Sequence, residues 1–484
     1  MKVDEIINNC LKKESNKPLI KARTFWNYCQ SPFNVWADYF ANEKEKDPED
    51  SYLKILFAKG NQHEEDFIKK VYPDVEKLKF PTKIDAFKFF VNEAFKKTKA
   101  FRNPSLYYLP ENSIAEPDIL EISKKHSSYF GNYHYIIKEV KSSKEPKKKD
   151  IMQTMFGNYL LSKIQGYLPP KFYIINNEDK QIEFKYKDYE HEFHKILNDI
   201  NEIVKGNRYP SPTNGSVDWP WESYALKLCI KTKDVSLING LAESKKSKLK
   251  EIGIRNLTQL SNINVNKKVN GFTKESLKRL KLEASCILTK KHKFISKVAL
   301  PKRKIELFLD FESSTDLNIE DFVGNIDYLI GVLKRENNKE VYIPFIADSI
   351  EDEEGMLHRF LDFLAEQEDF VIYHYGNYEI TRFKELFSKY DTDDDLQRLV
   401  FSNMIDIFRL VKKSVVLPVY SYSLKSVAPY LKFNWRLKDV DAGESIALYM
   451  EYVKTNDKKL LNKILTYNED DVIATRVVKD WLSK

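Results

Sequence analysis

The stretch at residues 304–312, KIELFLDFE, alternates apolar and polar side chains and ends in an acidic pair. The period of two and the high apolar content predict a mostly buried strand. Residues two apart on a strand point to the same face, so Asp310 and Glu312 should project together from its end. Two ionised carboxylates this close repel each other unless a cation lies between them, and oxygen ligands suit Mg²⁺ or Mn²⁺. The plain alternative is a strand that runs into an acidic loop.

The period changes near the C-terminus, where apolar residues at positions 459–481 recur at helical spacing. On this helix Tyr467 and Asp471 lie four residues apart and therefore share a face. The residues between them, Asn-Glu-Asp at 468–470, form an acidic cluster without basic neighbours. A solvated helix face is the alternative interpretation of such a cluster.

Between these segments the pattern predicts a hairpin, a helix and another strand. The hairpin spans residues 326–347 around a turn at 336–339, and the helix spans residues 351–366. The apolar run VIYHYGNYE at residues 371–379 then ends in Glu379. Glu379 is the third acidic candidate, and Tyr375 or Asn377 are polar candidates beside it.

An Asp-x-Glu strand, a middle acidic motif and Tyr-x-x-x-Asp on a terminal helix, in this order, resemble the DEDD-type 3′–5′ exonucleases of the tyrosine subclass, which have an RNase H-like fold. Many members have Asn and Asp in the middle motif, so Glu379 is a departure. This form resembles the RNase H-like domain that is fused to RecB-type nucleases. The segments SYSLK at 421–425 and DAGES at 441–445 match that branch as well.

The resemblance implies an RNase H-like mixed sheet with flanking helices over residues 300–484. It also implies that Asp310, Glu312, Glu379 and Asp471 hold two Mg²⁺ or Mn²⁺ ions. Tyr467 would orient the attacking water, and the reaction would be 3′–5′ exonuclease action on single strands.

A second acidic pattern lies in the N-terminal half. Residues 133–140 predict a strand that ends in Glu139, and Lys141 shares its face. A metal-binding carboxylate beside a lysine suits phosphodiester hydrolysis. Asp118, 21 residues upstream, is the second carboxylate, and His63, in a helical stretch that opens at Gly60, is a further ligand candidate. Glu-Val-Lys alone is common by chance.

Together these residues resemble the RecB-type PD-(D/E)XK nucleases, which implies a restriction-endonuclease-like α/β domain over residues 1–230 with one or two metal ions. Asp118, Glu139 and His63 would bind metal, and Lys141 would stabilise the attacking water or the developing charge. The family's next helix begins with Gln and carries a Tyr. Gln153 fits in the helix at 151–161, whereas Tyr159 comes two positions late and Gly157 occupies the usual place.

Some RecB-type nucleases hold an iron–sulfur cluster, with one cysteine near the start and three after the core. Cys29 and Cys229 match two of these positions, and residues 207–222 supply no others. Two thiolates do not provide the four ligands that a cluster takes. No cluster is therefore expected here.

Residues 231–295 predict a helical segment that resembles two helix–hairpin–helix motifs, with helices at 245–252, 257–263 and 275–288. Glycine-containing hairpins of this kind bring backbone N–H groups to a phosphate without reading bases. The run KSSKEPKKK at 141–149 offers further phosphate contacts beside Lys141. A generic helical linker and a solvated loop are the respective alternatives.

The composition agrees with a globular protein of several domains: 484 residues, 42% hydrophobic and 13% aromatic. A net charge of +7 fits a polyanion partner without requiring one. The charged start and the lack of a long apolar run predict a cytoplasmic, reduced protein without a membrane segment.

We therefore expect a metal-dependent nuclease with two centres that acts on DNA, on single strands or ends. Three alternatives stay open: an RNA exonuclease, one active centre beside a binding groove, and a non-catalytic nucleic-acid-binding protein. The sequence leaves open the pathway, a helicase partner and the oligomeric state.

Overall fold

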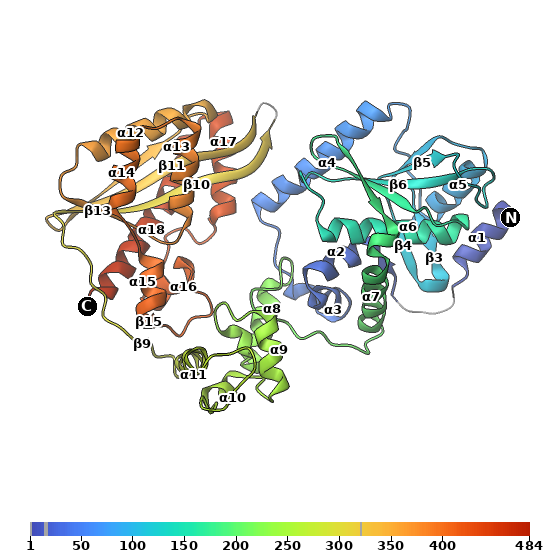
Figure 1. Ribbon diagram of the computed structural model, residues 1–484. Helices are drawn as coiled ribbons and strands as arrows, with labels where there is room; N and C mark the ends of the chain where they lie inside the picture. Colours follow the sequence, from blue (N-terminus) through green and yellow to red (C-terminus); the bar gives the residue numbers. More distant parts are fainter. Residues whose placement is uncertain (1, 14–17, 320–321) are drawn as a thin grey trace. The chain divides into compact units, whose positions relative to one another are not determined.

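The computed structural model describes residues 2–13, 18–319 and 322–484. The chain divides into two compact units, each described by itself below: Met1–Glu49 with Leu56–Cys229, and Asp50–Ile55 with Ile230–Lys484 (Figure 1). In the described part of the chain, no helix is both long and apolar enough to span a bilayer.

The elements up to Thr232 form an α/β arrangement around a five-stranded mixed sheet of order β2-β5-β6-β7-β8 and a smaller sheet of order β1-β4-β3. The strands are β1 (Ile20–Lys21), β2 (Ala100–Arg102), β3 (Leu106–Tyr108), β4 (Ser113–Ala115), β5 (Ile119–Ser123), β6 (His134–Val140), β7 (Lys171–Ile175) and β8 (Gln181–Lys185). The helices are α1 (Val3–Leu11), α2 (Ala22–Gln30), α3 (Pro32–Phe40), α4 (Ser51–Val71), α5 (Lys83–Phe95), α6 (Lys148–Gln165), α7 (Tyr186–Val204) and α8 (Glu222–Thr232). Helix α4 is continuous through Gly60, so the expectation that a new helix opens there is wrong.

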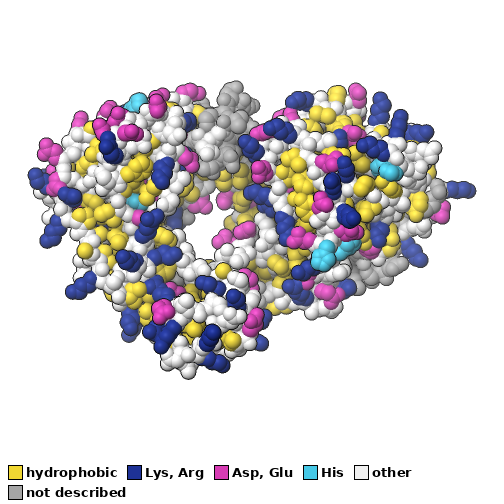
Figure 2. Space-filling view, viewed as in Figure 1, with side chains coloured by type: hydrophobic (Ala, Val, Ile, Leu, Met, Phe, Trp, Pro, Cys, Tyr) yellow, Lys and Arg dark blue, Asp and Glu magenta, His cyan; other side chains and the backbone are white. Residues whose placement is uncertain are grey.

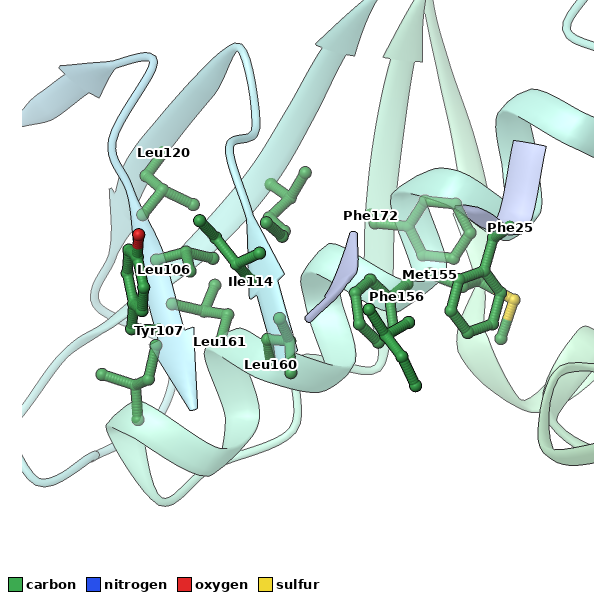
Figure 3. Packing of buried hydrophobic residues seen from close by; sticks show 14 of the residues in the cluster. Phe25, Leu106, Tyr107, Ile114, Leu120, Met155, Phe156, Leu160, Leu161 and Phe172 are labelled. Carbon is green, nitrogen blue, oxygen red and sulfur yellow. The ribbon is translucent and has the colours of Figure 1, made fainter. Parts of the chain in front are cut away.

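Helix α6 lies in the centre of the N-terminal core and is buried on nearly all sides, as expected for a helix without a polar face. Met155 and Phe156 pack with Phe25 and Phe172 (Figure 3). A Cβ atom on Gly157 would lie 3.0 Å from Ile137 Cδ1 on β6. Glycine at this position therefore lets α6 approach the strand that carries Glu139.

The C-terminal sheet has the order β12-β11-β10-β13-β14, with antiparallel pairing from β12 to β10 and parallel pairing from β10 to β14. The remaining strands are β9 (Lys293–Phe294), β10 (Ile305–Ile319), β11 (Phe322–Glu336), β12 (Lys339–Ile346), β13 (Phe370–His374), β14 (Met404–Asp406) and β15 (Val415–Val416). The remaining helices are α9 (Glu243–Glu251), α10 (Leu257–Ser261), α11 (Lys274–Thr289), α12 (Glu353–Ala365), α13 (Tyr378–Lys389), α14 (Asp394–Asn403), α15 (Ile407–Ser414), α16 (Leu424–Tyr430), α17 (Ala442–Thr455) and α18 (Lys458–Leu482). The predicted strand at 304–312, the hairpin at 326–347 and the terminal helix are confirmed as elements.

The alternation along β10 sorts its side chains between two cores. Leu307, Leu309 and Phe311 pack in a cluster with α12, α13 and α14. Phe308 packs in a second cluster with α15, α16 and α18. Because residues two apart share a face, Asp310 also projects to the side of the sheet that α18 covers.

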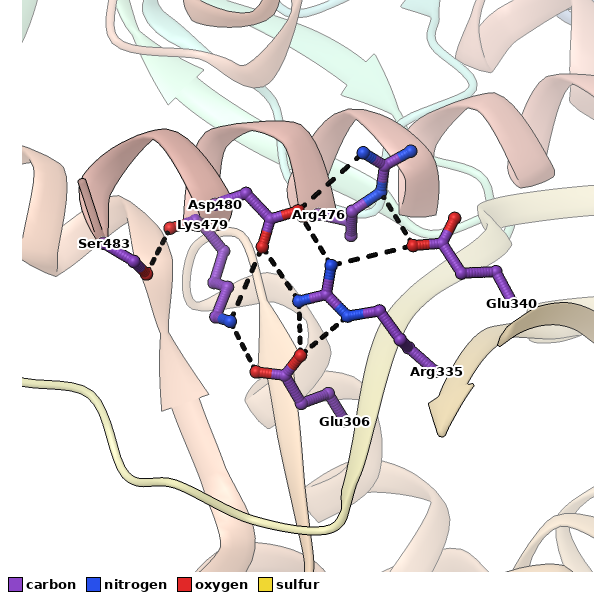
Figure 4. A network of polar contacts seen from close by, with 7 residues as sticks. All are labelled: Glu306, Arg335, Glu340, Arg476, Lys479, Asp480 and Ser483. Atoms are coloured by element: carbon purple, nitrogen blue, oxygen red, sulfur yellow. Dashed lines mark hydrogen bonds and ion pairs between the residues drawn. The ribbon is translucent and has the colours of Figure 1, made fainter. Parts of the chain in front are cut away.

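A polar network fixes α18 against the sheet, four residues before Asp310 on β10 (Figure 4). Glu306 opposes Arg335 on β11 and also pairs with Lys479 of α18, while Arg335 reaches Asp480 with Nη1 2.8 Å from Oδ2. A strand rises about 3.3 Å and a helix about 1.5 Å per residue. Holding Lys479 at Glu306 therefore places the middle of α18 over Asp310.

Candidate metal centres

Three carboxylates converge at the junction of β10 and α18. Asp310, Glu312 and Asp471 each offer an oxygen, and these oxygens lie within 4.8 Å of one another. Glu312 is 5% exposed and Asp471 7%. The structure thus brings together two residues of one strand with a residue more than 150 positions later.

Asn468 lies between the two strand carboxylates. Its Nδ2 donates to Asp310 Oδ2 at 2.9 Å and to Glu312 Oε1 at 3.3 Å, and its Oδ1 accepts from the Tyr342 hydroxyl at 2.9 Å. A Cβ on Gly331 would lie 1.5 Å from Asn468 Oδ1. Sequence reasoning grouped Asn468 with an acidic cluster and missed its role, because its hydrogen bonds join it to residues more than 150 positions earlier in the chain.

Burial and mutual repulsion shift the protonation of the cluster. Burial raises the pKa of Asp310 well above its usual range, and Asp471 and Glu312 raise it further. Burial, with Asp471, raises the pKa of Glu312 to about 8. Burial raises the pKa of Asp471 to about 6, against the opposing effects of Lys425, Trp435 and Tyr467. Such a cluster is stabilised when a divalent cation replaces the bound protons.

Tyr467 and Asp471 share the face of α18 that meets the cluster. Tyr467 is 3% exposed, and burial, followed by the nearby Asp471, raises the pKa of its hydroxyl. Trp435 Nε1 donates to Asp471 Oδ1 at 2.7 Å, which leaves the second carboxylate oxygen for another partner. The hydroxyl of Tyr467 therefore stays protonated and can donate or accept a hydrogen bond near the carboxylates.

Glu379 lies in the first turn of α13, outside the group of three but close enough to raise the pKa of Asp310. It is 2% exposed, and its Oε2 has no hydrogen-bond partner among the described residues. His374 Nδ1 lies 3.4 Å from this oxygen. A buried carboxylate oxygen without a donor is costly, so Glu379 fits the fourth ligand of a cation site.

In the N-terminal unit, β6 carries Glu139 and ends just before Lys141. Asp118, which precedes β5, shares a side-chain hydrogen bond with Glu139 and accepts from the backbone N–H of Val140 at 2.7 Å. Lys141 Nζ lies 3.5 Å from Glu139 Oε2. Burial, with Glu139, raises the pKa of Asp118. For Lys141, burial lowers the pKa, but Glu139, Asp118 and Asp150 raise it more, so the lysine stays charged.

Helix α4 presents Glu64 to this cluster, while His63 contacts the residue that follows β7. His63 Nε2 lies 3.2 Å from the carbonyl oxygen of Asn176. Burial raises the pKa of Glu64, and Asp118 raises it further, while Asn103 donates to its Oε1 at 3.2 Å. Among the described residues, His63 forms no three-ligand group with Asp118 and Glu139. Glu64 is the acidic neighbour that sequence reasoning missed, although it directly follows His63.

Helix α6, which follows Lys141, carries the two candidate residues Gln153 and Tyr159, and they have different surroundings. Gln153 is half-buried in α6. Tyr159 donates its hydroxyl to Glu111 Oε2 at 2.8 Å, and Lys163 Nζ lies 4.8 Å from its ring. In the lysine-rich run, Lys144 pairs with Glu178 at 3.3 Å and Lys148 pairs with Glu192.

Basic residues concentrate in one part of the chain. Residues 231–304 hold 20 Lys and Arg against 5 Asp and Glu, which gives this segment a net charge of +15. Because the whole chain carries +7, the remaining residues together carry −8. Figure 2 shows dark-blue side chains over the surface of α9–α11. Exposed members include Lys245, Lys250, Lys267, Lys268, Lys274 and Lys278. This segment is the strongest candidate for contact with a polyanion.

Comparison with known proteins agrees with the C-terminal geometry. No curated protein matches the chain. Residues 307–483 match the family model described as the RNase_H superfamily. The match supports an RNase H-like C-terminal part and suggests a nuclease-type, metal-dependent activity on nucleic acids.

Proposed function

We propose that the chain is a divalent-metal-dependent nuclease that removes nucleotides from the 3′ end of single DNA strands at the centre formed by Asp310, Glu312, Glu379 and Asp471. The observation that carries this proposal is the group of three carboxylates, two of them buried, whose oxygens lie within 4.8 Å of one another. A site that only bound nucleic acid would gain nothing from carboxylates that repel phosphate. The partnerless Glu379 oxygen supports a fourth ligand.

Each residue of this centre has a definable task. Bound Mg²⁺ or Mn²⁺ supplies a Lewis acid and activates water near neutral pH. Asp310, Glu312, Glu379 and Asp471 hold the metal, and Asn468 fixes the first two through its hydrogen bonds. Tyr467, protonated and beside Asp471, orients the attacking water by a hydrogen bond.

The 3′–5′ polarity and the single-stranded substrate are supported by the order of the motifs, Asp-x-Glu, Glu379 and Tyr-x-x-x-Asp, which resembles the DEDD-type exonucleases. A choice of DNA over RNA is supported by the two glycine-containing turns before α10 and α11. Gly253 and Gly271 adopt φ of +84° and +82°, the left-handed backbone that suits glycine in tight turns of this kind. This segment would hold the backbone without reading sequence.

We propose a second, RecB-type centre at Asp118, Glu139 and Lys141, with His63 and Gln153 as further members. The hydrogen-bonded carboxylate pair and the charged Lys141 at 3.5 Å from Glu139 support it. Asp118 and Glu139 would bind metal, while Lys141 would stabilise charge that develops on the phosphate.

The experiment compares cleavage of end-labelled single- and double-stranded DNA and RNA with Mg²⁺ or Mn²⁺. The variants are Asp310→Asn, Lys141→Met and the double variant, and Asp362→Asn, an exposed position on α12, is the control. Asp310→Asn should abolish removal of single 3′ nucleotides, and Lys141→Met should abolish any remaining cleavage. The proposal fails if the double variant cleaves as the control does.

Salt dependence tests the basic segment. Binding by the double variant should weaken steeply with salt, with a slope proportional to the number of phosphates contacted. Changing Lys267 and Lys268 to Gln should reduce that slope by about 1 to 2 on a logarithmic scale. An unchanged slope would locate the phosphate contacts elsewhere.

A further inference from the structure

Lys425 in the first turn of α16 lies over two aromatic rings at the edge of the C-terminal centre. Its Nζ is 4.2 Å from the centroid of the Tyr467 ring and 5.1 Å from that of Trp435. Both rings belong to residues beside Asp471. Cation–π contacts restrain an ammonium group without using its N–H donors. Lys425 is exposed, so these contacts restrain its ammonium group beside the centre while its three donors stay available.

The cation faces the acidic cluster without pairing with it. The charge of Lys425 acts to lower the pKa values of Asp471, Asp310 and Glu312. Yet among the described residues no carboxylate oxygen lies within 4.0 Å of Lys425 Nζ, so this ammonium group forms no ion pair there. The ammonium group is thus near the carboxylates but separated from them by space that another group can fill.

That space is a depression of about 390 Å³. Asp310 and Asp471 line one part of it, Lys425 another, and Tyr375 and Phe408 contribute aromatic surface. The rings of Tyr375 and Phe408 lie edge to face with centroids 5.8 Å apart. An anion bound beside Lys425 in this depression would be adjacent to an aromatic surface that suits a base or sugar.

We propose that Lys425 is a catalytic residue that binds the scissile phosphate of the terminal nucleotide, with its Nζ donating to a non-bridging oxygen. This inference rests on the proposed nuclease function and adds a residue to which no role has been assigned. In the reaction the oxygen of water bonds to phosphorus and the bond from phosphorus to the 3′ oxygen breaks. The proton passes to the 3′ oxygen, so that a 5′-monophosphate and a strand with a 3′ hydroxyl are released. Lys425 stabilises the negative charge that grows on the phosphate oxygens during this step.

The test measures binding and turnover separately in full-length protein that carries Lys141→Met, so that only the C-terminal centre responds. Lys425→Met and Lys425→Arg are compared with Lys463→Met, an exposed lysine on α18, as the matched control. Calorimetry in Mn²⁺ follows thymidine 5′-monophosphate, inorganic phosphate and unphosphorylated thymidine. Kinetics follow release of single nucleotides.

Lys425→Met should weaken thymidine 5′-monophosphate binding by about tenfold or more and lower kcat by about 100-fold. Thymidine binding and Mn²⁺ binding should not change, and Lys425→Arg should restore most of the nucleotide affinity because it keeps the charge. Equal values for Lys425→Met and Lys463→Met would overturn the proposal. An equal loss of thymidine and nucleotide binding would overturn it too, since that pattern indicates a damaged pocket.

Different results would contradict the nuclease function and the phosphate contact of Lys425. If the parent protein shows no metal-dependent turnover, the nuclease proposal fails, while a phosphate-specific binding loss in Lys425→Met still establishes the phosphate contact. If turnover is present and Lys425→Met leaves both kcat and nucleotide binding intact, the Lys425 proposal fails alone.

Discussion

Asn468 Nδ2 lies 2.9 Å from Asp310 Oδ2 and 3.3 Å from Glu312 Oε1, so one neutral amide bridges two carboxylates that would otherwise repel each other. The amide is fully buried, and Tyr342 fixes its orientation from the opposite side. The bridge restrains the two carboxylates side by side in the group whose oxygens lie within 4.8 Å of one another.

Asn468→Ala should weaken Mn²⁺ binding about 10- to 100-fold, as the loss of a partner that orients metal ligands typically does. Calorimetric titration of Mn²⁺ into the Lys141→Met background measures this. Asn462→Ala, an exposed asparagine on the same helix, is the control and should bind Mn²⁺ normally. Normal affinity in Asn468→Ala would show that the carboxylates hold their positions without the amide.

Gly331→Ala should reproduce much of this defect from the neighbouring strand, because the new Cβ would overlap Asn468 Oδ1 and displace the amide. It should also lower the thermal midpoint. In the double variant with Asn468→Ala the clash is absent. The loss of unfolding free energy in the double variant should therefore be smaller than the sum of the losses in the two single variants. Strict additivity would contradict this account of Gly331.

The acidic cluster should make the metal-free protein less stable as pH rises. Glu312 has a pKa of about 8 in the folded protein against 4.5 ordinarily. The folded state therefore binds protons more tightly, and this stabilisation is present below pH 4.5 and lost as pH rises to 8. In EDTA the thermal midpoint should fall by about 3 °C or more between pH 5 and pH 8.

Two comparisons isolate this effect from other titrating groups. Glu312→Gln should show a smaller fall between the same pH values, because it removes the shifted carboxyl. Saturating Mn²⁺ should remove the fall in the unaltered protein, since the cation takes the place of the protons. A pH profile that Glu312→Gln does not alter would refute the assignment.

Glu64→Gln should impair the N-terminal centre, because Glu64 faces Asp118. Residual cleavage in the Asp310→Asn background should fall at least tenfold, comparable to loss of a group that supports a metal ligand. Glu65→Gln is the matched control, since the neighbouring Glu65 pairs with Arg102 instead. His63→Gln distinguishes the sequence-based ligand from the structural neighbour: a larger loss there would favour His63.

Much of the C-terminal centre was predictable because its signals are local. Asp310 and Glu312 share a strand face by periodicity, and Tyr467 and Asp471 share a helix face. Asn468, Gly331 and Lys425 were not predictable in their roles, because their contacts join segments distant in the chain. Asn468 looked like one polar residue of a solvated face, yet it is fully buried.

The N-terminal unit shows the same division. The strand with Glu139 and the position of Lys141 follow from local pattern, whereas the approach of Asp118, which accepts from the N–H of Val140, depends on the pairing of β5 with β6. Which of the two side chains, His63 or Glu64, approaches Asp118 depends on the rotation of α4 about its axis. Neighbouring residues on a helix point about 100° apart, so a small rotation, set by packing, decides which one faces the site.

The sequence by itself determined which side chains are carboxylates, which of them share a face, and that apolar alternation buries β10 between two layers. These properties follow from backbone periodicity and side-chain chemistry, which act within a few residues. Only the tertiary structure decided that α18 lies antiparallel over β10 in the register that puts Asn468 between Asp310 and Glu312. That register depends on the ion pairs of Glu306 with Lys479 and Arg335 and on the space at Gly331, which exist only once the helix and the sheet have packed.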